Sequence, residues 1–119
     1  MESGRFVILE HRTAPAVHWD FMLEWGEVLR TWSLTQPPAP ACKLDATSIP
    51  DHRKLFLDYE GPISRGRGTV TRWDSGRFTL VSGREGTIVV ELAGRKLAGR
   101  ATLDRKTPGA PSWLFRFEG

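Results

Sequence analysis

The chain has 119 residues, of which 39% are hydrophobic and 26% charged, so it can bury one packed core and is not disordered throughout. Its formal net charge of +3 is mildly basic, which is compatible with a phosphate-bearing partner without requiring one. The single cysteine, Cys42, excludes an internal disulfide framework and a Cys-rich zinc site. No apolar run approaches the roughly 20 residues of a membrane span, and residues 1–9 lack the features of a signal peptide. We therefore expect one domain over residues 1–119, no membrane partner and a cytoplasmic location.

Short segments of alternating apolar and polar residues, separated by Gly, Pro, Ser or Asp, dominate the chain. They predict strands over residues 5–10, 17–25, 28–34, 54–59, 68–73, 77–82, 87–92, 96–103 and 113–117. Residues 36–50 contain four prolines and predict an irregular crossing with room for one helical turn, and residues 74–76 predict a turn. The fold class is therefore all-β: a small closed or nearly closed antiparallel β-barrel of about eight short strands, with little helix.

The segment 17–25 shows the clearest alternation. One face carries four large apolar side chains and should be buried: Trp19, Phe21, Leu23 and Trp25. The opposite face must be solvated, paired or metal-bound, because it carries a histidine and two carboxylates: His18, Asp20, Met22 and Glu24. We expect the chain's five tryptophans to lie mostly in the core, with stacking on nucleic-acid bases as the alternative.

The chain has only three histidines, at positions 11, 18 and 52. His18 and Asp20 are two residues apart on one predicted strand, so their side chains point the same way and can share one ion. His11 lies just after the end of the preceding predicted strand, and a short connection would bring it beside His18. Two imidazoles and one carboxylate suit Mn²⁺, Fe²⁺ or Zn²⁺ with open positions. Spacing alone does not decide between such a site and an ordinary hydrogen-bonded pair.

The surrounding sequence resembles the 3′-phosphoesterase domain of bacterial DNA ligase D. The similarity begins with residues 6–11 (FVILEH), 18–24 (HWDFMLE) and 28–32 (VLRTW), against a family pattern F-V-x-x-x-H, H-[YW]-D-F-R-L-E and G-x-L-x-S-W. Further elements follow in the family's order: residues 51–52 (DH), 59–61 (YEG), 68–70 (GTV), 73–74 (WD), 96–99 (KLAG) and 113–115 (WLF). The resemblance spans nearly the whole chain, and its H-[YW]-D-F-x-L-E segment is the specific part.

This resemblance implies a compact β-barrel enzyme of DNA repair that removes a 3′-terminal ribonucleoside and then the 3′-phosphate, with manganese as its metal and zinc as an alternative. By the same resemblance, His11, His18 and Asp20 match the metal ligands, and His52 matches the catalytic histidine that contacts phosphate. The implied partners are DNA or RNA–DNA 3′ ends, together with repair ligase or polymerase proteins. A protonated His52 could stabilise charge on the phosphoryl oxygens or protonate the leaving oxygen.

The sequence departs from the family on the phosphate side of the site. Met22 replaces an arginine that would clamp phosphate, and Phe56 replaces a tyrosine. The glycine-rich loop is shortened to residues 63–70, and the gap between the first two histidines is one residue longer. We also expect the chain to lack the arm that precedes the barrel in the family, together with its ligase and polymerase modules. Arg65 and Arg67 in the shortened loop either bind phosphate from another direction or are solvated.

Three functions therefore remain open: a metal-dependent phosphoesterase acting on nucleic-acid 3′ ends, a catalytically weakened module that binds nucleic acid or a repair partner, and a phosphoesterase redirected to a small phosphorylated metabolite. We favour the first, because all three histidines stand at motif positions in a chain that has no others.

Overall fold

The computed structural model describes residues 2–119, and its nine strands form one antiparallel sheet. The 3₁₀ turn η1 spans Lys54–Leu57. The strands are β1 Ser3–Thr13, β2 Ala16–Trp25, β3 Val28–Leu34, β4 Cys42–His52, β5 Gly61–Pro62, β6 Thr69–Arg84, β7 Thr87–Gly94, β8 Ala98–Arg105 and β9 Ser112–Glu118. Among the residues described, no helix has the length and apolar character needed to cross a membrane.

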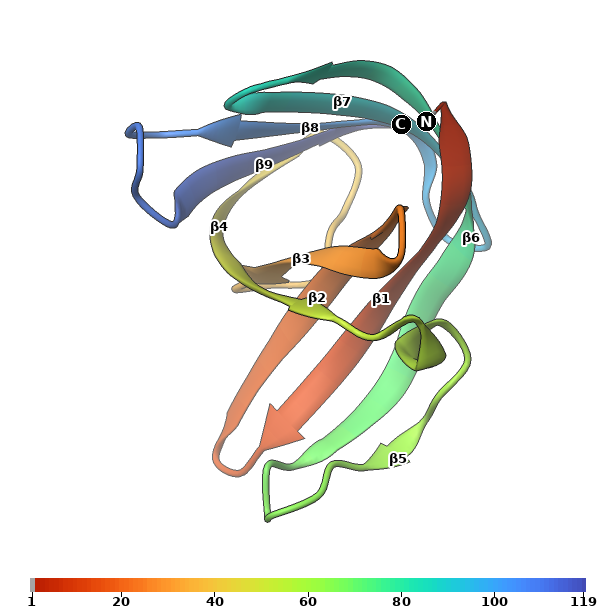
Figure 1. Cartoon of the computed structure of the whole chain (residues 1–119), viewed down its shortest axis with the longest axis vertical. Helices are drawn as coiled ribbons and strands as arrows, with labels where there is room; N and C mark the ends of the chain where they lie inside the picture. Colours follow the sequence, from red (N-terminus) through yellow and green to blue (C-terminus); the bar gives the residue numbers. More distant parts are fainter. Residues whose placement is uncertain (1) are drawn as a thin grey trace.

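The sheet curls into a ring. Its strand order is β1-β2-β3-β4-β9-β8-β7-β6-β5, and β6 also pairs with β1, so every strand except β5 belongs to a nearly closed barrel (Figure 1). The paired ends of β1, β2 and β6 extend away from the rest of the ring, and β5 lies at that end (Figure 1). The all-β, nearly closed antiparallel barrel predicted from the sequence is confirmed.

The interior of the ring is filled by the apolar face that the alternation predicts. Phe21 and Leu23 are fully buried in this core, while Trp19 and Trp25 are partly buried against it. Trp32 and Trp113 are also buried in the core, and Trp73 packs on its edge. The prediction that the tryptophans belong mostly to the core is therefore confirmed. Burial of these large rings helps to stabilise so short a chain.

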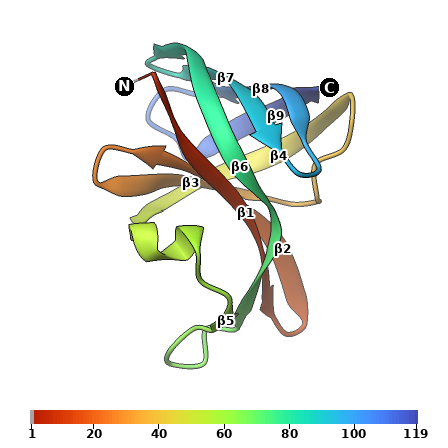
Figure 2. The ribbon, with the colours of Figure 1, turned by 90° about the vertical axis from the view of Figure 1, so that its right-hand side faces the viewer.

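A second, smaller cluster lies on the outer face of the sheet, and the sequence did not predict it. Six buried side chains form this outer cluster: Val7, Leu9, Met22, Leu29, Leu57 and Val70. Figure 2 shows η1 outside the ring, beside β1 and below β3. From there it places Leu57 over the strands. Two ion pairs help to hold η1 in place, Lys54 Nζ with Glu24 Oε2 at 3.2 Å and Arg5 with Asp58 just beyond the turn at 2.6 Å.

The predicted strand over residues 54–59 is therefore wrong. Residues 55–57 are consecutive apolar side chains without period-2 alternation, and only Leu57 is buried. Backbone hydrogen bonds from Phe56 N–H to Arg53 O and from Asp58 N–H to Leu55 O, both 3.1 Å, close the turn instead.

Two further predictions fail at irregular points of the sheet. The irregular crossing predicted over residues 36–50 holds only up to Ala41, because β4 begins at Cys42 and continues through Pro50. A register shift against β3 at this end accommodates the proline.

The turn predicted at residues 74–76 is also absent, since β6 runs through it with a register shift opposite Ile8 and Leu9. There Gly76 lies so close to β7 that a Cβ would sit 2.1 Å from Ala93 O.

Candidate functional site

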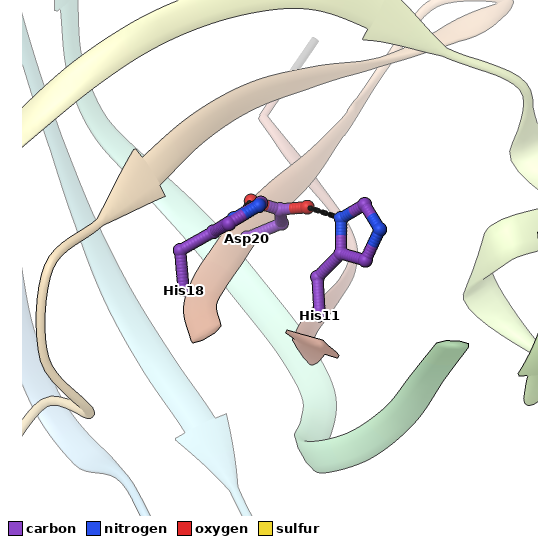
Figure 3. A group of neighbouring side chains, drawn as sticks. All are labelled: His11, His18 and Asp20. Atoms are coloured by element: carbon purple, nitrogen blue, oxygen red, sulfur yellow. Dashed lines mark hydrogen bonds and ion pairs between the residues drawn. The ribbon is translucent and has the colours of Figure 1, made fainter. Parts of the chain in front are cut away.

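The pairing of β1 with β2 brings the predicted ligands together. His11 and His18 are direct cross-strand partners, and Asp20 lies two residues further along β2 on the same face. Their rings are 4.7 Å apart, and one potential ligand atom from each of His11, His18 and Asp20 lies within 4.8 Å of the others. Figure 3 shows the Asp20 carboxylate between the two imidazoles.

Asp20 is 2% exposed and interacts with both histidines. The Nδ1–H of His18 donates to Asp20 Oδ1 at 2.7 Å, while His11 Nδ1 lies 3.4 Å from Asp20 Oδ2. The hydrogen bond to Asp20 raises the pKa of His18 above its usual value and outweighs the opposing effect of partial burial. The negative charge of the buried Asp20 carboxylate therefore stabilises a positive charge next to it. That charge can be a proton on an imidazole or a bound cation.

The tautomer of His11 follows from a second contact. Its Nε2–H donates to the backbone carbonyl of Arg67 at 2.7 Å, which leaves Nδ1 without a proton in the neutral ring. In that neutral tautomer an unprotonated nitrogen faces a carboxylate oxygen 3.4 Å away, and two electron-pair donors at this distance are stabilised by a cation between them. Two imidazoles with a buried carboxylate form a mixed N/O donor set for a borderline divalent ion, so the residues fit a metal.

A hollow of about 380 Å³ opens beside this cluster. Its wall includes His11 and Asp20 of the cluster. His52 lines the same hollow. His18 is not part of the wall and borders the site through Asp20. The complete lining is Leu9, His11, Asp20, Met22, Pro50, Asp51, His52, Arg53, Phe56, Ile63, Arg67 and Val70.

His52 is the last residue of β4 and is held in a defined orientation. Its Nδ1–H donates to Pro50 O at 3.0 Å, and its ring packs edge-on against Phe56 with centroids 5.5 Å apart. The contact at Nδ1 leaves Nε2 available to a ligand in the hollow. The 3₁₀ turn that carries Phe56 therefore also positions His52.

The shortened loop places its two arginines differently. Arg67 lines the hollow, but its guanidinium folds back onto Ser64, with Nε donating to Ser64 O at 2.9 Å. Arg65 is exposed in the loop at a positive φ of 64° and is not part of the wall. A phosphate role for either side chain stays a prediction.

Sequence reasoning missed two contributions to this site. Arg53 lines the hollow directly after His52, which its position next to a motif histidine could have indicated. The backbone carbonyl of Arg67 orients His11, and no side-chain pattern predicts a main-chain acceptor. The two departures noted in the sequence, Met22 and Phe56, both line the same hollow and make that part of its wall apolar.

The sequence profile of the DNA ligase D 3′-phosphoesterase domain matches residues 10–105, a range that includes the three histidines and Asp20. The chain belongs to this family. Similar members include the multifunctional non-homologous end joining protein LigD of Pseudomonas aeruginosa, 36% identical over 111 residues that make up 85% of this chain. The multifunctional non-homologous end joining DNA repair protein LigD of Mycobacterium tuberculosis H37Rv is 32% identical over 113 residues, or 87% of the chain. The matched region makes up only 13% and 15% of the length of these two relatives.

Proposed function

We propose that this chain is a metal-dependent phosphoesterase that processes nucleic-acid 3′ ends in end-joining repair, removing a 3′-ribonucleoside or a 3′-phosphate. Membership of the LigD 3′-phosphoesterase family supports the reaction class. The observation that carries the proposal is that His11, His18 and Asp20 form one cluster, two of whose members, His11 and Asp20, line a hollow that His52 also lines.

His11, through Nδ1, together with His18 and Asp20 would hold the ion, with Mn²⁺ as the proposed metal and Zn²⁺ as an alternative. Such an ion supplies Lewis-acid polarisation of a phosphoryl oxygen and activates water near neutral pH. Asp20 is the anionic ligand, and the hydrogen bond from His11 Nε2–H to Arg67 O fixes the nitrogen that faces the ion. His18 must give up the proton that it shares with Asp20 if Nδ1 is to bind the metal.

The other side of the hollow would contact the phosphate. With Nδ1–H held by Pro50 O, a proton on His52 Nε2 can be donated to a phosphoryl oxygen or to the leaving oxygen. Arg53 is exposed beside His52 and forms no side-chain ion pair within residues 2–119, so its guanidinium is free to bind an anion there. The substrate is then held between metal ligands on β1 and β2 and cationic groups at the end of β4.

The test is a manganese-dependent assay on a primer–template that carries a 3′-terminal ribonucleotide or a 3′-phosphate, with inorganic phosphate and released nucleoside measured. The wild-type chain should form product only with the metal, and His18→Ala should abolish product while retaining the fold. Product that is independent of metal, or equal activity of a folded His18→Ala variant, would contradict the proposal.

One observation favours a second candidate, a binding module with weakened turnover. Met22 and Phe56 give the hollow an apolar wall where the resembling family has an arginine and a tyrosine. Loss of one charge-assisted contact to phosphate typically costs about 2–4 kcal/mol of transition-state stabilisation, or roughly thirty- to a thousandfold in rate. Metal uptake and binding of DNA 3′ ends without product would select this candidate, with repair ligase or polymerase proteins as its proposed partners.

A further inference from the structure

A second hollow, at a mouth of the barrel, carries two arginines. It has a volume of about 290 Å³ and lies between β3, β4, β8, β9 and the loop before β9. Arg30 and Arg105 bring two positive charges to its wall, and Ser48 brings a hydroxyl. None of these residues lines the hollow at the histidine cluster.

The two guanidinium groups are held by tryptophan faces. Arg30 Cζ lies 5.1 Å from the ring centroid of Trp25 and 5.0 Å from that of Trp32. Arg105 Cζ lies 5.1 Å from the centroid of Trp113, and the rings of Trp32 and Trp113 are themselves in contact at 5.6 Å. A guanidinium stacked through its flat face keeps its N–H edge free, and that edge matches the geometry of phosphate.

Little negative charge neutralises this pair. Among residues 2–119, Arg30 has no carboxylate within ion-pair distance, and Arg105 has only Glu85 at 3.8 Å, whose side chain is 91% exposed. Burial lowers the pKa of Arg30, and the charge of Arg105 adds to this effect while the charge of Asp51 opposes it. An arginine stays protonated despite such a shift, so two cations face a hollow whose wall contains no carboxylate.

The surroundings are fixed before any ligand arrives. The backbone N–H of Ser48 donates to Pro111 O at 2.8 Å, which ties β4 to the loop that forms the far wall. Ser48 lines the arginine hollow, and Pro50, Asp51 and His52 line the histidine hollow, so both hollows border β4.

We propose that Arg30, Arg105 and Ser48 form a separate binding site for a backbone phosphate of a nucleic-acid strand. The site goes beyond the proposed end chemistry, because it needs neither metal nor hydrolysis. It binds the strand at a position away from its 3′ terminus, and Trp25, Trp32 and Trp113 report occupancy through their fluorescence.

The test measures binding of a single-stranded oligothymidylate with a plain 3′-hydroxyl, in EDTA, over a range of salt concentrations. Arg30→Gln and Arg105→Gln should each weaken binding roughly tenfold at low salt and reduce the slope of log K against log salt by about 0.7. Arg77→Gln is the matched control, since Arg77 is an exposed arginine on β6, across the ring from β4, and should leave the slope unchanged. The control also measures the effect of removing one charge in general.

Because Arg30 packs on two indoles, Arg30→Lys serves as the second variant if Arg30→Gln does not fold. Arg30→Lys keeps the positive charge but loses the planar guanidinium. Affinity for the oligothymidylate should therefore fall, while the slope of log K against log salt stays the same. The proposal is overturned if folded Arg30 and Arg105 variants bind as tightly and with the same slope as wild type, or lose no more than Arg77→Gln. Binding is measured without metal, so the result does not depend on whether the chain hydrolyses 3′ ends.

Discussion

The 3₁₀ turn η1 connects packing to the site, and its two leucines provide a matched pair of perturbations. Leu57 is 4% exposed in the outer cluster, whereas Leu55 in the same turn is 44% exposed. At about 0.8 kcal/mol for each buried CH₂, the carbons removed by Leu57→Ala carry about 2.4 kcal/mol of transfer free energy. The residual cavity brings the expected loss to about 3 kcal/mol. Leu55→Ala should change stability by no more than about 0.5 kcal/mol.

Most of this loss should appear as local opening of η1. The turn lies at the edge of the molecule, where its one buried side chain is Leu57. Native-state hydrogen exchange of the Phe56 and Asp58 amides, which are bonded to Arg53 O and Leu55 O, reports this opening directly. A loss of about 3 kcal/mol corresponds to exchange more than about a hundredfold faster. Leu55→Ala should accelerate the same amides less than about threefold.

The opening should also affect function selectively, because Phe56 packs on His52 while the histidine–aspartate cluster belongs to β1 and β2. Leu57→Ala should therefore lower phosphoester turnover and leave metal affinity within about twofold of wild type. Equal exchange rates in the two alanine variants, or a parallel loss of metal binding in Leu57→Ala, would refute this assignment of η1.

Three further predictions concern single side chains. Met22→Arg restores a guanidinium at the wall of the hollow and should raise phosphoester turnover at least about tenfold. Met22→Leu is the control and should not raise turnover. A folded Met22→Arg variant that is no faster than wild type would contradict the role given to this wall. Because the folded-state pKa of His18 is raised, its contribution to metal-free stability should be full below the pKa of an unfolded histidine and lost as pH rises through the folded value. Denaturation of the metal-free chain across this range should show the decline, and Asp20→Asn should remove it. Asp74→Ala should destabilise the fold by about 3–5 kcal/mol in chemical denaturation, and Asp74→Asn by less, because this buried carboxylate accepts the backbone N–H groups of Ser75, Arg95, Lys96 and Leu97.

The sequence predicted the fold best where alternation and short connections act together. Strands β2 and β3 follow from period-2 patterning on both sides of a tight turn, and β3 was predicted with its observed bounds. The errors share one cause, since tertiary contacts decided the local conformation. A proline at a register shift allows β4 to continue, a bulge carries β6 through an expected turn, and Leu57 must reach an outer cluster that no local pattern reveals.

The residues of the candidate site likewise differ in how far the sequence predicted them. The proximity of His11, His18 and Asp20 followed from two neighbouring strands, because the side-chain period of a strand is fixed. The place of His52 came from the resemblance alone, since η1 and the end of β4 determine it. Arg53 could have been indicated by its position directly after His52, whereas the carbonyl of Arg67 depends on how the loop folds back onto the sheet and has no signal in the sequence.

The central claim is that a divalent ion is held by His11, His18 and Asp20. Calorimetric titration of the metal-free chain with Mn²⁺ tests it most directly, because binding is measured without substrate. The account predicts one site per chain that is lost in His18→Ala and in Asp20→Ala and retained in His52→Ala. Undiminished Mn²⁺ binding by folded His18→Ala, or loss of the ion in His52→Ala alone, would contradict it.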